Sequence, residues 1–290
     1  MSIQESVARA QTTLKEQPWR LFASQISVLV RNEVRRNLFT RRRIWVYLLA
    51  LIPVIIIFLH YLLDKNRSPS QLEEDTFVLA GIVQFYYLRL GIFFACMGIF
   101  TWLFRGEIVE RTLHYQFLVP VRKEVLVVGK FIAGCTISIA LFETAVLACF
   151  SITYLRLGST GSSYVFEGLG LSQLGSYLLV TALACLGYGA VFLLLSMMFR
   201  NPAPAAMLVL GWEAINPVLP SLLQKISVAA YLRHLMPVNV AAEGIFALLT
   251  VQTEPVSGWA ATLGLLALIA VVLFYSCYRI RTLEIRYTTE

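Results

Sequence analysis

The chain has 290 residues, of which 58% are apolar and only 14% are charged, and it carries a net charge of +7. Soluble domains contain about half apolar and about a quarter charged residues. With a mean hydropathy of +0.71, the composition therefore excludes an ordinary soluble protein and indicates an integral membrane protein. Anionic lipid in the cytoplasmic leaflet suffices to explain the positive charge, so no nucleic acid partner is expected.

The segment before the first apolar run, residues 1–43, carries a helical pattern of its own. Phe22, Ile26, Leu29 and Val34 recur at helical spacing, and arginines lie beside this stripe. The pattern predicts an amphipathic helix that lies in the inner membrane interface. A soluble, partly disordered tail is the alternative.

Six apolar runs follow, each of a length suited to a membrane-spanning helix rather than to a barrel strand. They are Ile44–Leu63, Phe77–Phe104, Val125–Leu155, Gln173–Phe199, Ala203–Leu222 and Val256–Tyr278. We therefore predict an all-α integral membrane protein with six transmembrane helices in one transmembrane domain, 44–279, followed by a cytoplasmic tail, 280–290. Eighteen of the 24 Lys and Arg residues lie in segments that this topology places inside. The bias predicts a multi-pass protein of the inner (plasma) membrane with both termini cytoplasmic.

Two outer segments are distinctive. The connection Arg156–Ser172 is rich in Gly and Ser, which predicts a flexible loop. The segment 222–255 is semi-apolar, carries several charges and is interrupted by Pro237, so neither half can span a bilayer. We expect two short helices that dip into the outer leaflet and return, because irregular backbone at membrane depth must be covered by protein or face water. The alternative is an amphipathic loop that lies on the membrane surface, and the sequence favours neither arrangement.

The loop between the second and third runs, 105–124, is charged and amphipathic. Glu107, Glu110, Arg111 and His114 are spaced i, i+3, i+4 and i+7, which places them on one face of a helix. Apolar residues lie mainly on another face. The pattern predicts a docking surface for a soluble partner, with an ordinary solvated loop helix as the alternative.

Short motifs in this loop and before the last run suggest a family. They are Gly106-Glu107, Glu110-Arg111-Thr112-Leu113, Val119-Pro120-Val121-Arg122, Gly129-Lys130 and Leu235-Met236-Pro237-Val238-Asn239. Their order resembles the permease subunits of ABC exporters of the ABC-two membrane class, which have the type V exporter fold. Arg111 stands where that family usually has Gly.

The resemblance implies a six-span subunit that forms a homodimer, or a heterodimer with a second permease, and sits on two ABC ATPase subunits. The loop 105–124 would contain the coupling helix that docks on the ATPase, and the returning helices would cap the outer end of the pathway. Membrane lipids are the other expected partner.

The chain offers no site of its own for ATP. Gly129-Lys130 lacks the upstream glycine and the following hydroxyl residue of a phosphate-binding loop. We therefore expect no cofactor on this chain, with ATP and Mg bound by the partner ATPase. The sequence shows no metalloprotease or nucleophile-elbow motif, so no catalytic residue and no metal are assigned.

Three ionisable residues lie deep in the predicted spans: Arg89, Glu143 and Glu213. At about 1.5 Å per residue they come to similar depths near mid-bilayer. An unpaired charge there costs at least about 2.5–3.5 kcal/mol. We therefore expect an Arg89–Glu143 bridge, with Glu213 joining it or protonated. Such a network either holds helices together or lines the pathway.

The function expected from these features is outward movement of a drug-like, lipid or glycan-lipid substrate with ATP hydrolysed by a separate subunit. The chain by itself is not expected to be an enzyme. Two alternatives remain: a non-transporting assembly subunit of a larger complex, and an intramembrane enzyme that uses Glu143, Glu213 and a His.

Overall fold

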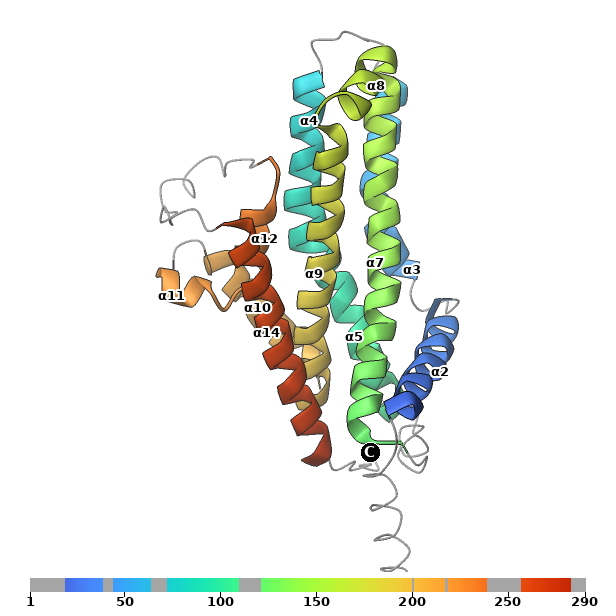
Figure 1. Ribbon diagram of the computed structural model, residues 1–290, viewed down its shortest axis with the longest axis vertical. Helices are drawn as coiled ribbons and strands as arrows, with labels where there is room; N and C mark the ends of the chain where they lie inside the picture. The colour runs from blue at the N-terminus through green and yellow to red at the C-terminus, as the bar shows by residue number, and fades with distance from the viewer. Residues whose placement is uncertain are drawn as a thin grey trace, which may run out of the picture.

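The computed structural model describes residues 19–38, 44–63, 72–109, 121–199, 201–216, 219–238 and 257–282. Within these ranges the chain is almost entirely helical and contains no strand (Figure 1). The predicted all-α class is confirmed for this part of the chain.

Long apolar helices form the body of the molecule. They are α3 (Ile44–Leu63), the continuous run of α4 (Leu72–Gly81), η3 (Ile82–Gly91) and α5 (Ile92–Val109), α7 (Lys123–Arg156), α9 (Gly170–Met198) and α14 (Gly258–Arg279). Among the described residues, these five helices are long and apolar enough to cross a membrane. The best spanning windows of α7 and α9 are 67% and 61% buried, against 22% for α3 and α14. Helices α7 and α9 therefore form the centre of the bundle, whereas α3 and α14 lie on its outside.

The predicted spans agree with these helices, with one exception. The first run coincides with α3, and the ends of the second, third, fourth and sixth runs lie close to helix ends. The fifth run, Ala203–Leu222, corresponds to α10 (Pro202–Ile215), which has 14 residues. Such a helix is about 21 Å long, shorter than a hydrocarbon core of about 30 Å. The count of six spans therefore stays a prediction.

The Gly- and Ser-rich outer loop is more ordered than its composition suggests, because it contains α8 (Gly158–Phe166). Gly158 has φ of +59°, a conformation that glycine adopts without steric cost, and it turns the chain from α7 into α8. The rings of Tyr154 and Tyr164 stack at 5.2 Å, and both hydroxyls donate hydrogen bonds to Gln173 Oε1. Aromatic packing on α7 and a hydrogen bond to α9 therefore hold α8 in place.

The described part of the segment before the last span contains two short helices, α11 (Ser221–Gln224) and α12 (Val228–Leu235). Both precede Pro237. Residues 239–256, beyond the proline, lie outside the described residues, so the expected pair of returning helices stays a prediction. Helix α12 packs against α9, α10, α14 and η3 on one side of the bundle (Figure 1). Its depth in the outer leaflet stays a prediction.

The N-terminal helix expected from the apolar stripe forms as α2 (Trp19–Leu38). It packs along the first part of α7 (Figure 1). A Cβ added at Gly129 would lie 2.3 Å from Leu29 Cδ2, so α2 approaches α7 as closely as a glycine permits. Leu29 and Val34 of the stripe thus pack on protein. Whether α2 lies in the membrane interface stays a prediction.

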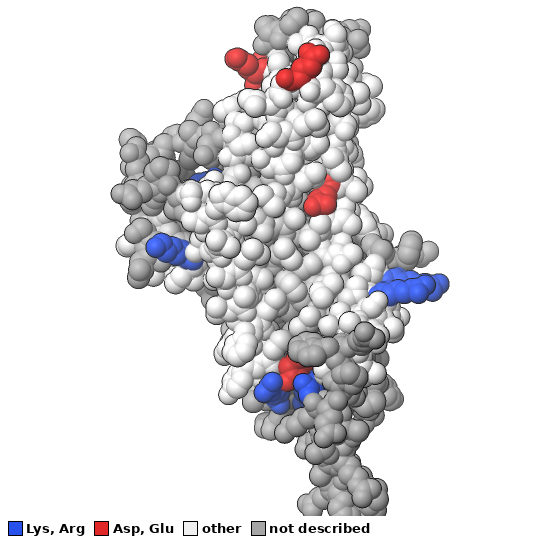
Figure 2. Space-filling view, viewed as in Figure 1, with Lys and Arg blue, Asp and Glu red and all other residues white. Residues whose placement is uncertain are grey.

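Charged side chains are few on the broad face formed by α7, α9 and α14. Figure 2 shows them gathered mainly toward the ends and edges of this face. Exposed apolar side chains continue along α3 and α14, including Ile56, Leu62, Trp259 and Phe274. Such a surface suits lipid and not water, as expected for helices that cross a bilayer.

Candidate functional site

A buried ion cluster joins α2, α5 and α7 at the base of the loop 105–124. Lys130 Nζ lies 2.8 Å from Glu33 Oε1 and 2.8 Å from Glu107 Oε1, and it donates a hydrogen bond to Leu103 O at 2.9 Å. Lys130 is fully buried, and the side chains of the two glutamates are only 5% and 4% exposed. Three helices far apart in sequence are therefore connected through one ammonium group.

Further groups surround this cluster. Asn37 Nδ2 donates to Glu33 Oε2 at 2.9 Å, and Arg36 Nη1 lies 3.5 Å from Glu107 Oε1. The ring of Phe104 lies 5.4 Å from Lys130 Nζ, within range of a cation–π contact. The two carboxylates thus lie close to two cations and to an amide donor. Close pairing and hydrogen bonding of this kind offset the desolvation cost of burying ions.

Local sequence explains how the cluster assembles. Glu33 and Asn37 are four residues apart on α2, and Leu103 and Glu107 are four apart on α5, so each pair shares a helix face. Gly129 lets α2 come close to α7, and the next residue, Lys130, then lies between the two faces. The Gly-Lys pair therefore acts in two ways, as a close-packing position and as the central cation.

The cluster changes the role expected for Glu107. Its carboxylate was predicted to face a soluble partner, but the residue is only 3% exposed and is paired inside the chain. Glu110, Arg111 and His114 lie outside the described residues, so their docking role stays a prediction. Sequence reasoning missed Lys130 and Glu33. The signal was available, because a lysine that enters a membrane span needs a counter-ion.

A second polar site lies where α10 meets α12. Glu213 is 6% exposed and accepts hydrogen bonds from Val228 N at 3.1 Å and Ala229 N at 3.2 Å. It also accepts one from Ser227 Oγ, whose oxygen in turn caps α12 by accepting from Ala230 N at 3.2 Å. A carboxylate at a helix N-terminus is favoured by the free N–H groups and the helix dipole. Glu213 therefore anchors α12 to α10.

A small cavity of about 60 Å³ lies beside this anchor. Its lining comprises Gln84, Phe85, Leu88, Arg89, Phe93, Tyr188, Leu210, Glu213, Ala229, Leu232, Arg233 and Met236. Of the three deep charges identified in the sequence, the structure brings Arg89 and Glu213 to this one cavity. Glu143, on α7, does not line it. No ion pair joins Arg89 to Glu143 within the described part of the chain. The expected bridge is therefore absent there. Arg233 also lines the cavity, and the sequence analysis assigned it no role.

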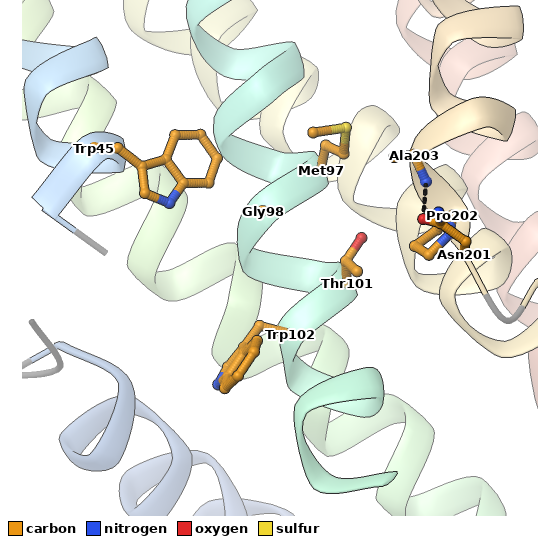
Figure 3. Close-up of a pocket in the computed structure, with 8 residues that line it drawn as sticks. All are labelled: Trp45, Met97, Gly98, Thr101, Trp102, Asn201, Pro202 and Ala203. Atoms are coloured by element: carbon orange, nitrogen blue, oxygen red, sulfur yellow. Dashed lines mark hydrogen bonds between the residues drawn. The ribbon is translucent and has the colours of Figure 1, made fainter. Parts of the chain in front are cut away.

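A larger hollow of about 370 Å³ lies beside the middle of α5 (Figure 3). Trp45 of α3 lies on one side of it, Met97, Gly98, Thr101 and Trp102 of α5 on the next, and Asn201–Ala203 at the start of α10 on the third. The side chain of Asn201 accepts a hydrogen bond from Ala203 N and so begins α10. The walls are mostly apolar and suit packing or an apolar ligand rather than bond-making chemistry.

The described helices define the class of the protein, a multi-pass α-helical membrane protein. Residues 38–211 match the model of a family described as "ABC-2 family transporter protein". Because this match covers more than half of the chain, the protein belongs to that family, as its motifs indicated. It is a membrane domain of the ABC transporter permease type. A comparison with curated proteins gives no match.

Proposed function

We propose that this chain is the permease subunit of an ABC exporter. It moves a drug-like, lipid or glycan-lipid substrate outward, and a separate nucleotide-binding subunit binds ATP and Mg and hydrolyses the ATP. The family match supports the transporter class. The observation that carries the mechanism is the buried cluster of Lys130, Glu33 and Glu107. It joins the helices on both sides of the loop 105–124 to each other and to α2.

The helices on both sides of the loop are long enough to act as a lever. The helix Leu72–Glu107 has 36 residues and α7 has 34. They are therefore about 54 Å and about 51 Å long. A push on the loop between them moves both helices together with α2, since Lys130 connects all three. Displacement of this unit against the rest of the bundle is a motion of the kind that drives alternating access.

The proposal includes two protein partners, and the family match supports the first of them. An ABC ATPase docks on the loop through Glu110, Arg111 and His114, and a second permease copy completes the pathway as a homodimer or heterodimer. The chain lies in the inner membrane with both termini in the cytoplasm. Support for this orientation comes from the basic residues concentrated in the segments that it places inside.

The test is purification of the full-length, affinity-tagged chain from its native membrane. We expect an ATP-binding subunit to co-purify and to hydrolyse ATP in a nanodisc. The paired reversal Glu110→Lys with Arg111→Glu should weaken both association and hydrolysis, whereas Lys225→Glu, at an exposed site in the returning segment, should change neither. Absence of any ATPase, or normal coupling in the paired reversal, would contradict the proposal. An ATPase whose activity never responds to substrate would favour an assembly subunit instead.

A further inference from the structure

Among its described lining residues, the cavity beside α12 has more positive than negative charge. Arg89 of η3 and Arg233 of α12 both line it, and Glu213 is the one carboxylate that the described part of the chain contributes. That carboxylate is already engaged by three donors at the start of α12. Neither arginine forms an ion pair within the described part of the chain. Two guanidinium groups therefore share a cavity in which the one carboxylate of the described lining already accepts hydrogen bonds from α12.

The charge on Arg89 also acts on Arg233. Arg233 lies outside the spanning helices, and burial lowers the pKa of its guanidinium, as does the like charge on Arg89, whereas Glu213 raises it. An anion that enters the cavity would therefore lie beside two guanidinium groups that line it.

The position of Arg89 makes this charge costly without a partner. It lies near the middle of the 36-residue helix Leu72–Glu107 and is exposed in the single chain. Each end of that helix is about 27 Å away. A guanidinium at such depth is costly in a bilayer unless it is paired or faces a water-filled cavity. Both conditions are met where Arg89 lines the cavity and an anion enters it.

The backbone and walls suggest which kind of anion. Gln84, Phe85 and Arg89 all belong to η3, a ten-residue π-helical segment, and π-helical turns occur frequently at functional sites. Phe85, Phe93 and Tyr188 supply an aromatic wall. The cavity volume is about 60 Å³, more than one water molecule needs. The site has room for one compact charged group, with apolar surface around it for a hydrocarbon chain.

We propose that Arg89 and Arg233 bind the oxyanion head of an amphiphile, a carboxylate or phosphate attached to an apolar chain. Guanidinium groups recognise both oxyanions through paired, charge-assisted hydrogen bonds. The assignment of this amphiphile as the transported substrate rests on the proposed export function. The binding site itself does not.

The experiment measures binding to the purified full-length chain in nanodiscs of zwitterionic phosphatidylcholine. The probe is dansylated undecanoic acid, and its primary amide is the neutral control. We expect saturable binding of the acid, and weaker binding of the amide by about tenfold or more. Arg89→Gln and Arg233→Gln should each weaken binding of the acid by a similar factor. Arg89→Lys should retain part of the affinity, and Lys225→Gln should bind as the parent chain does.

Competition separates the possible sources of the anion. Dodecyl phosphate should displace the probe, whereas inorganic phosphate at the same concentration should not. Displacement by inorganic phosphate alone would mean a site for a free ion and would overturn the amphiphile assignment. Equal binding of acid and amide, or unchanged binding in both Gln variants, would overturn the site itself. Because no ATPase is present, arginine-dependent binding can be found even where the proposed export function fails.

Discussion

Replacement of Lys130 by Met tests the central structural claim, that one buried ammonium holds α2, α5 and α7 together. Met has a similar length and no charge, so Lys130→Met removes the cation and retains most of the volume. Glu33 and Glu107 would then remain 4% and 3% exposed, without the group that lies 2.8 Å from each. Arg36, whose side chain is 46% exposed and lies 3.5 Å from Glu107, cannot replace it for both carboxylates.

The expected loss is large because a buried charge is left without compensation. Removal of one partner from a buried ion pair typically costs about 3–5 kcal/mol. At about 2–4 °C per kcal/mol for chains of this order of size, the melting temperature should fall by about 6–20 °C. Removal of one stranded carboxylate as well, in Lys130→Met with Glu107→Gln, should recover part of this loss.

The chain contains its own reporter for this measurement. Cys96, Cys135, Cys149 and Cys185 are buried free thiols, and a thiol-reactive dye labels them only when the helices separate. The matched control is Lys225→Met, the same substitution at an exposed lysine, which should melt as the parent chain does. If Lys130→Met melts within a degree or so of the control, the cluster does not hold the three helices together.

Three further variants test smaller effects with the same thermal assay. Ser227→Ala removes both the hydroxyl donor to Glu213 and the N-cap of α12, and it should cost about 1–2 kcal/mol. Gly98→Ala places a Cβ 2.1 Å from Trp45 Cζ2, so the indole must move at a cost of about 1–3 kcal/mol. Arg281→Gln breaks an ion pair with α7 in which the arginine side chain is 64% exposed, and the loss should stay below about 1 kcal/mol. A loss for Arg281→Gln as large as for Lys130→Met would contradict the distinction between exposed and buried pairs.

Helix positions were predictable from the sequence because a bilayer imposes a simple rule. Each span needs about 20 apolar residues, and α3, α7, α9 and α14 satisfy it plainly. The shorter α10 does not, since it has 14 residues. Composition also misled at α8, where glycine and serine suggested a loop. Tertiary contacts of Tyr154 and Tyr164 override that local preference.

Charge pairing was predictable only in outline. Counting residues along helices gave matched depths for Arg89, Glu143 and Glu213, but depth alone does not fix the side of the helix on which a charge lies. The structure shows Glu213 turned toward the backbone N–H groups of α12. A sequence pattern of charges cannot identify that partner, because backbone donors at a helix start carry no residue signature. Arg233 was likewise assigned no role, since its helix could not be placed.

The two sites lie on one continuous helix, and this arrangement gives the lever a physical basis. Glu107 ends the helix that carries Arg89 near its middle, so the ion cluster and the cavity are separated by about 27 Å of unbroken helix. Between them α5 is a regular α-helix, which transmits displacement well, whereas η3 is π-helical at the cavity itself. The backbone hydrogen bonds of π-helical turns depart from the regular α-helical pattern, so such turns allow the helix axis to change direction. A push that enters through Lys130 and Glu107 would therefore bend the helix where Arg89 meets α12. This is the point at which release of a bound anion requires the two guanidinium groups to separate.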